Sequence, residues 1–325
     1  MSVSPAGRKI RNGSLVIGLV ILAVVILVAL NLSEVRDMGR LVQRTQPRWL
    51  AGALLLQSTT YVAQGQTWQV VTRAAGYRVL PVRAFALSLV TQFVNQVLPT
   101  AGLSGTLVMA TALENRGIPR ATVMASAVVS LVSYYAAFVA ALGIAVGIAI
   151  IDGHASYLVI AAAVLFGSLG AVFVGAILYL SGREAPRAAW ARRLPPVRRV
   201  LELLHEADRR LVRAPGLVAR SCAFQLVVVM LDAATLWILI LALGVVASPT
   251  GVFASFMISS LFRTIGLVPG GLGVFEAASV VTLGLVGVSV PVALAATLLF
   301  RGLSFWLPML PGMLLWRRTR TGPLA

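Results

Sequence analysis

Long apolar runs separated by short polar segments dominate the hydrophobic pattern of this chain. A helix needs roughly 20 predominantly apolar residues to cross the hydrocarbon core of a bilayer, and six segments satisfy that length. These predicted spans are residues 13–32, 49–72, 121–150, 156–180, 217–243 and 291–316. The pattern therefore predicts an all-α polytopic membrane protein that begins with an N-terminal anchor span.

Two further apolar stretches, 84–113 and 250–288, are interrupted at their centres by "LPTAGLSG" and "VPGGLG". We expect each to form two half-helices joined by a tight tip. The arms of the first stretch have about fifteen residues, which is too short to cross at 1.5 Å per residue, so this hairpin is predicted to be re-entrant. The arms of the second have about eighteen residues, and two full spans remain an alternative there.

The order span, hairpin, span occurs twice, at 49–150 and at 217–316. Because the connecting span 156–180 and the basic linker 181–216 lie between the two copies, the second copy is predicted to be inverted. Inverted repeats with broken helices near the midplane are typical of transporters, and the broken segments indicate the binding site.

Composition agrees with a membrane protein, since 59% of residues are hydrophobic, 11% are charged and the mean hydropathy is +0.93. The net charge of +17 would favour a nucleic-acid partner in a soluble domain, but the basic residues lie between apolar runs and act as topology signals. We therefore expect no nucleic acid and place both termini in the cytoplasm. Lys9 is the only lysine among many arginines, which together with abundant Ala, Val and Gly indicates a GC-rich bacterial coding sequence. We expect the protein in the bacterial inner membrane.

The linker 181–216 is rich in arginine and is predicted to contain an interfacial amphipathic helix on the cytoplasmic leaflet. Its apolar face would consist of Val197, Val200, Leu201, Leu204 and Leu211.

Residue types that carry catalysis are sparse. Cys222 is the only cysteine, and His154 and His205 are the only histidines, so the sequence indicates neither a disulfide framework nor a metal site. It also contains no Walker-type phosphate loop and no nucleophile–base set. We expect a protein that is not an enzyme and has no cofactor.

Four charged residues are predicted near mid-depth, Asp232, Arg263, Glu276 and Arg301. A charge there costs at least about 2.5–3.5 kcal/mol, so such residues face a protein interior or a watery cavity. Ion pairs that hold the repeats together and direct contact with a substrate are both open, and the two can coexist. We favour Arg301 as the partner of Glu276 because it opens the adjacent helix.

The hairpin tips are candidate anion sites, because the first turn of a helix presents free N–H groups and a positive dipole end. The alternative is that proline and glycine only make tight turns there. The candidate tip residues are Pro99, Gly102 and Ser104 in the first hairpin and Pro269, Gly270, Gly271 and Gly273 in the second.

Amide side chains mark the first repeat. They would line a polar groove, with hydrogen bonding between helices as the alternative. One helical face of 49–72 carries Gln57, Tyr61, Gln64 and Trp68, followed by Arg73 at the cytoplasmic end, while Gln92, Asn95 and Gln96 approach the first tip.

The blocks "FRTIGLVPGGLGVFEAA", "LLFRGLSFWLPMLPG", "QGQTWQVVTRAAGYRV" and "TQFVNQVLPTAGLSG" resemble the flippase-type membrane domain of lysylphosphatidylglycerol synthetases and its stand-alone relatives. The family pattern is an arginine before Pro-Gly-Gly-x-Gly, a glutamate after it, and an aromatic-Arg pair that opens the last helix. These places are occupied by Arg263, Pro269, Gly270, Gly271, Gly273, Glu276, Phe300 and Arg301. The resemblance implies movement of a phospholipid or lipid-linked glycan between leaflets. The synthetases also carry a soluble aminoacyl-transferase domain, whereas this sequence ends at Ala325 after the last span, so lysine transfer is not expected.

We therefore expect a lipid flippase or scramblase for an anionic phospholipid or a polyprenyl-linked lipid. Arg263 and Arg301 would contact the headgroup phosphate, while Glu276 and Asp232 would hold the arginines apart or exchange protons. The alternative is a non-transporting accessory subunit of a cell-envelope lipid or glycan assembly system. An ion or solute transporter and a membrane-embedded enzyme are less favoured. A second copy of the chain or an envelope-assembly protein are the further partners left open.

Overall fold

The computed structural model describes residues 45–97, 103–151, 157–181, 204–265 and 271–321, and these ranges contain helices but no strand. The predicted anchor 13–32 lies outside the described residues, as do the predicted tip residues Pro99, Gly102, Pro269 and Gly270. The statements below concern the described ranges alone.

The helices follow the predicted elements closely. Their bounds are α3 Pro47–Ala74, α4 Pro81–Val97, α5 Leu103–Glu114, α6 Arg120–Ile151, α7 Tyr157–Leu180, α10 Arg209–Val212, α11 Pro215–Ala242, α12 Pro249–Ile265, α13 Val274–Leu285, α14 Val290–Arg301, the π-helix η2 Gly302–Trp306 and α15 Leu307–Thr321. Pro47 and Pro215 open α3 and α11, because proline suits the first helical position, where its missing N–H would have no partner. Gly76 and Gly244, with φ of 88° and 83°, follow the ends of the same two helices, in the left-handed conformation that glycine adopts without strain.

The two halves of the chain contain helices of matching lengths. Both α3 and α11 have 28 residues, both α4 and α12 have 17, and both α5 and α13 have 12. The stretch 290–321, formed by α14, η2 and α15, is as long as the 32-residue α6. The two halves therefore share one order of elements and one set of lengths.

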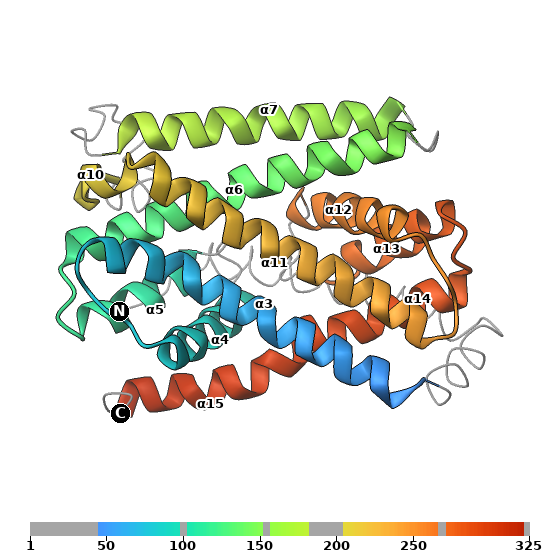
Figure 1. Cartoon of the computed structure of the whole chain (residues 1–325), viewed down its shortest axis with the longest axis horizontal. Helices are drawn as coiled ribbons and strands as arrows, with labels where there is room; N and C mark the ends of the chain where they lie inside the picture. The colour runs from blue at the N-terminus through green and yellow to red at the C-terminus, as the bar shows by residue number, and fades with distance from the viewer. Residues whose placement is uncertain (1–44, 98–102, 152–156, 182–203, 266–270, 322–325) are drawn as a thin grey trace, which may run out of the picture.

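Packing between the halves is reciprocal (Figure 1). Helices α3 and α11 lie side by side through the middle of the bundle. The hairpin α4–α5 lies near one end of the long helices and packs on α15, whereas the hairpin α12–α13 lies near the other end and packs on α6. Each hairpin thus packs against the closing helical stretch of the other half.

Four helical stretches are long and apolar enough to cross a membrane, namely 120–151, 163–180, 215–242 and 290–316. Helix α3 has sufficient length but is not among them, and its glutamines, including Gln57, Gln64 and Gln69, lower its hydropathy. The structure therefore describes a helical protein with four apolar spans, and the total of six spans remains a prediction.

The second hairpin and the linker differ from expectation. The return arm α13 has 12 residues rather than about eighteen, because it begins only after the cap at Gly273 and ends at Leu285, shortly before Gly287 with its φ of 85°. In the linker, the side chain of Asp208 accepts a hydrogen bond from the Arg210 amide and starts the short helix α10 anew. The predicted amphipathic helix is consequently broken before Leu211, and Leu204 is buried in the protein.

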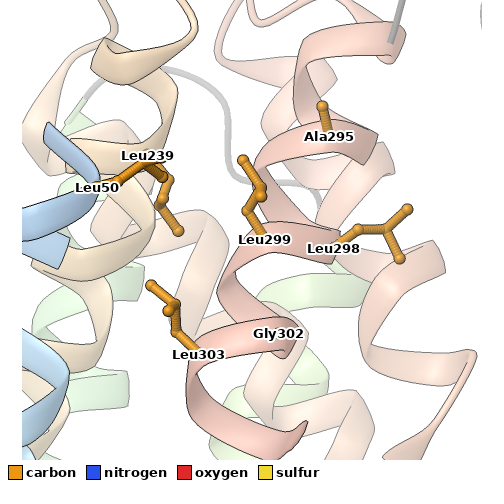
Figure 2. A pocket seen from close by; sticks show the side chains of 7 residues that line it. All are labelled: Leu50, Leu239, Ala295, Leu298, Leu299, Gly302 and Leu303. Carbon is orange, nitrogen blue, oxygen red and sulfur yellow. The ribbon is translucent and has the colours of Figure 1, made fainter. Parts of the chain in front are cut away.

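The last long helical stretch changes register at η2, a single π-turn between α14 and α15. Such turns are rare and are often found at functional sites. An apolar groove with a volume of about 310 Å³ lies beside this turn, between α3, α11 and α14 (Figure 2). Leu50, Leu239, Leu299 and Leu303 point into it.

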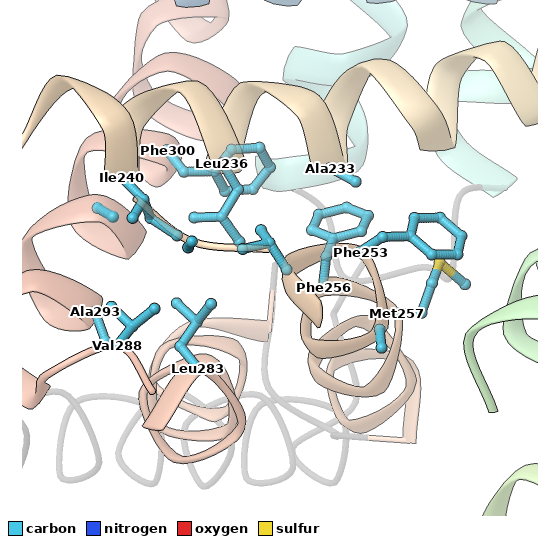
Figure 3. Packing of buried hydrophobic residues seen from close by; sticks show 14 of the residues in the cluster. Ala233, Leu236, Ile240, Phe253, Phe256, Met257, Leu283, Val288, Ala293 and Phe300 are labelled. Atoms are coloured by element: carbon cyan, nitrogen blue, oxygen red, sulfur yellow. The ribbon is translucent and has the colours of Figure 1, made fainter. Parts of the chain in front are cut away.

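The largest hydrophobic core joins the second hairpin to α11 and α14. Phe253, Phe256 and Met257 of α12 belong to one buried cluster with Leu236 of α11 and Phe300 of α14, which are labelled in Figure 3. The rings of Phe256, Phe275 and Phe300 lie 5.7 to 6.1 Å apart between centroids, which is the spacing of favourable aromatic pairs. This packing holds the start of α13 close to the end of α14.

Candidate functional site

Glu276 in the first turn of α13 makes two short contacts through its two carboxylate oxygens. Oε2 accepts a hydrogen bond from the backbone amide of Gly273 at 2.7 Å, and Oε1 pairs with Nε of Arg301 at 2.7 Å. Glu276 and Arg301 are only 6% and 4% exposed. The structure therefore confirms the predicted pair and adds a second role for the carboxylate, which caps the helix to which it belongs.

Phe275 lies between the two arginines of the site. The guanidinium carbons of Arg263 and Arg301 are each 5.7 Å from the centroid of its ring, and Arg301 lies 4.5 Å from the ring of Phe305 in η2. A cation over an aromatic face is attracted by the negative face of the ring, and the attraction grows when water is excluded. Aromatic rings therefore help to hold both arginines in place within the bundle.

Within the described ranges, Arg263 differs from Arg301 in having no carboxylate partner. It is half-buried at the end of α12 and forms no ion pair with any residue in the described ranges. Its side chain lies directly against Gly271, where an added Cβ would sit 3.1 Å from Cβ and Cδ of Arg263 and closer still to Cγ. The absence of a side chain at Gly271, whose φ is 64°, leaves the space that Arg263 occupies.

Asp232 on α11 belongs to a polar network that reaches α3 and η2. Its Oδ1 accepts a hydrogen bond from Gln57 Nε2 at 3.2 Å, and the charge of Arg263 acts on its carboxylate. The Gln57 amide nitrogen also lies 3.4 Å from the Tyr61 hydroxyl, which donates to the Ser304 carbonyl at 3.1 Å. These hydrogen bonds thereby connect α3, α11 and η2.

At both hairpins, a side-chain oxygen of the protein accepts a hydrogen bond from a backbone N–H group in or beside the first turn of the return helix. Asn95 Oδ1 accepts from the Gly105 amide at 2.9 Å in the first turn of α5, and Glu276 takes the Gly273 amide. The N–H groups predicted to be open to phosphate are therefore partly engaged. In α4, Gln92 is half-buried, and Gln96 Oε1 is buried without a partner in the described ranges. Ser104 lies in the first turn of α5.

Arg73 and Gln64, two of the predicted site residues, lie further along α3. Arg73 is exposed and donates to Gln69 Oε1 at 2.7 Å, and it lies about 24 Å from Gln57 by helical rise. Gln64 is half-buried about 10 Å from Gln57 on the same measure. The structure thus brings Asp232, Arg263, Glu276 and Arg301 together but leaves Arg73 at the helix end.

Three groups of the candidate site were not predicted from the sequence. Phe275 and Phe305 gave no signal beyond their place in an apolar run, and the Ser304 carbonyl is a backbone atom exposed by the π-turn. The sequence places Gln57 and Tyr61 on one helical face, but nothing in it links them to Asp232, which lies 175 positions from Gln57.

Apolar spans around a buried, compensated charge cluster define a multi-pass membrane protein. The chain belongs to the family described as the lysylphosphatidylglycerol synthase TM region, which matches residues 15–312. It is 26% identical over 316 residues to a UPF0104 membrane protein of Methanothermobacter thermautotrophicus, covering 90% of each chain. The resemblance inferred from the sequence blocks is thus confirmed, and the relative's name assigns it no enzymatic activity.

The buried pair predicts a specific pattern of rescue. Glu276→Gln should destabilise the protein by about 3–5 kcal/mol, because it leaves the Arg301 charge buried without its partner. Glu276→Gln with Arg301→Gln should recover much of that loss, measured as thermal unfolding of the purified protein in detergent. Glu276→Gln with Arg263→Gln is the matched control and should recover nothing. Equal recovery in both double variants, or in neither, would contradict the assigned pairing.

Proposed function

We propose that this protein is a lipid transporter, a flippase or scramblase that moves an anionic phospholipid or a lipid-linked glycan between leaflets. Membership of the TM-region family supports a role with membrane lipids. The observation that carries the proposal is Arg263, a half-buried guanidinium beside apolar spans, held over Phe275 without an ion-pair partner in the described ranges. A phosphate is the anion that such a group would meet in a bilayer.

The two arginines then have different tasks. Arg301 is compensated by Glu276 and fixes the start of α13 against the end of α14. Arg263 replaces the solvation that a phosphate loses when it leaves water, through charge-assisted hydrogen bonds from a planar fork of donors. The charges of Asp232 and Arg263 attract each other, but the two residues form no ion pair in the described ranges. A headgroup would therefore not have to break a protein ion pair to reach Arg263.

The architecture that we propose is an inverted repeat of 49–150 and 217–316, with six spans and two re-entrant hairpins, preceded by the anchor 13–32. The connecting span 156–180 and the basic linker 181–216 separate the repeats. The matching lengths of the paired helices and the reciprocal packing of α4 on α15 and α12 on α6 support this arrangement. The 12-residue arms α5 and α13 support re-entrance, since each measures about 18 Å against a core of about 30 Å.

A headgroup would move between the hairpins while its tails remain in hydrocarbon. The lipid acyl chains could lie against the apolar groove of Figure 2, which is lined without polar side chains. We propose that the polar path includes the hairpin residues Gln92, Asn95, Gln96, Pro99, Gly102, Ser104, Pro269, Gly270, Gly271 and Gly273, and that Gln64 and Arg73 line its approach from the cytoplasm. The proposed location is the cytoplasmic membrane of a bacterium, with both termini inside.

Labelling of single cysteines tests the topology. In a Cys222→Ala background, Thr100→Cys and Ser104→Cys should resist an impermeant maleimide added outside intact cells, because a re-entrant tip stays at membrane depth. Val246→Cys is the positive control, since this residue is 92% exposed between α11 and α12 on the side proposed to be outside. Ready labelling at Thr100→Cys together with Val246→Cys would show two full spans instead.

Reconstitution tests the function. Liposomes that contain the protein should equilibrate fluorescent phosphatidylglycerol or a polyprenyl-linked phosphate sugar between leaflets faster than empty liposomes. Arg263→Lys should slow this by roughly tenfold or more, because lysine keeps the charge but loses the fork of donors. Arg213→Lys, at an exposed position after α10, is the control and should keep the wild-type rate. If no lipid moves faster with the wild-type protein, the transport proposal fails and the accessory-subunit alternative is favoured.

A further inference from the structure

One buried acceptor in the site has no donor. Gln57 is 3% exposed, and its Oε1 has no hydrogen-bond partner in the described ranges. The orientation of the amide is set by Nε2, which donates to the Asp232 carboxylate, because a flipped amide would place two acceptors against each other. The free oxygen is therefore a property of the site.

An unsatisfied buried acceptor is costly, and an apolar side chain of similar shape would remove that cost. Such groups in a folded protein are commonly completed by water, an ion or a ligand. The described part of the chain therefore supplies no hydrogen-bond donor for Gln57 Oε1, and a ligand could supply one.

Gln57 also lines a cleft of about 110 Å³ between α3, α4 and the η2–α15 segment. Most of its wall is apolar, formed by Leu54, Phe85, Leu89, Leu303, Leu307, Pro308 and Pro311, with Ser58 and Tyr61 beside the glutamine. The Ser58 and Tyr61 hydroxyls already donate to backbone carbonyls. Leu54 and Leu307 are 44% and 41% exposed on the surface of the bundle, so the cleft is reached from the lipid side.

We propose that Gln57 accepts a hydrogen bond from a hydroxyl group on the lipid headgroup whose phosphate binds Arg263. This inference rests on the proposed function and narrows its substrate class to phosphodiester lipids with hydroxyl-bearing headgroups. Phosphatidylglycerol and a polyprenyl-linked sugar share that chemistry.

A hydroxyl fits this position better than an ammonium group. The free acceptor is a neutral amide oxygen, and the nearest carboxylate, Asp232, already accepts from Gln57 and feels the charge of Arg263. Among the described cluster residues, Asp232 and Glu276 balance Arg263 and Arg301. A cationic headgroup group would therefore find no uncompensated negative charge here.

The test compares phosphodiester lipids that differ in the hydrogen-bond donors and the charge of their headgroups. Phosphatidylglycerol, phosphatidylmethanol, phosphatidylethanolamine and a polyprenyl-linked phosphate sugar, each fluorescent, are placed at trace level in phosphatidylcholine liposomes with the full chain, and transfer is followed by quenching of the outer leaflet. Phosphatidylmethanol keeps the phosphodiester charge but has no donor. We expect phosphatidylglycerol, the sugar lipid or both to move roughly tenfold faster than phosphatidylmethanol and phosphatidylethanolamine. The faster of the two identifies the source of the hydroxyl group.

Variants separate the acceptor from its neighbours. Gln57→Met should remove the preference, so that hydroxyl-bearing lipids and phosphatidylmethanol move at one rate. Loss of support for Asp232 alone would slow all lipids by the same factor and keep the preference. Gln66→Met, the same change elsewhere on α3, should keep the preference. If Gln57→Met does not fold, Gln57→Asn replaces it, because the shorter side chain moves the acceptor oxygen away by one methylene group. The same loss of preference is expected.

Equal rates for phosphatidylglycerol, the sugar lipid and phosphatidylmethanol in the wild-type protein would overturn the inference while leaving transport intact. A preference that survives in a folded Gln57 variant would overturn it too, as would a phosphatidylethanolamine rate equal to the fastest hydroxyl lipid. Absence of any movement would count against the proposed function itself.

Discussion

The carboxylate of Glu276 is the contact on which the site depends, because it satisfies the Gly273 amide and the Arg301 guanidinium together. In a bilayer there is no water to take over a lost partner, so a helix that starts inside the membrane needs an internal acceptor, and a buried cation needs an anion. One side chain meets both needs. It thereby fixes α13 against α14 and places Phe275 where Arg263 can lie over its ring.

From this anchor a polar route crosses the bundle. Arg263 attracts Asp232, Asp232 accepts from Gln57, and Tyr61 reaches the carbonyl that the π-turn presents at Ser304. The route joins both halves of the chain at the point where α3 and α11 lie side by side. Its charges cancel, yet one cation lacks an ion pair and one amide oxygen lacks a donor within the described ranges. In our proposal, a phosphate lipid with a hydroxyl headgroup would supply both missing partners.

Much of the helix layout could be predicted from the sequence, because apolar length, Pro at helix starts and Gly after helix ends act locally. The Glu276–Arg301 pair was also predictable, since a charge predicted at mid-depth needs a partner and Arg301, 25 positions further on, lies on the adjacent predicted helix. The π-turn at 302–306 was not, because it changes the helical register without a distinct residue pattern. Contacts such as Gln57 with Asp232 arise only when distant helices pack, and the Asn95 contact with Gly105 depends on how tightly two arms approach.

The central claim is that Arg263 binds a lipid phosphate at membrane depth. An experimental structure of the protein in nanodiscs that contain phosphatidylglycerol tests it most directly. The account predicts headgroup density between the hairpins, with the phosphate within about 4 Å of the Arg263 guanidinium and the Glu276–Arg301 pair intact. Headgroup density confined to the bilayer surfaces, with Arg263 paired to Asp232, would contradict it.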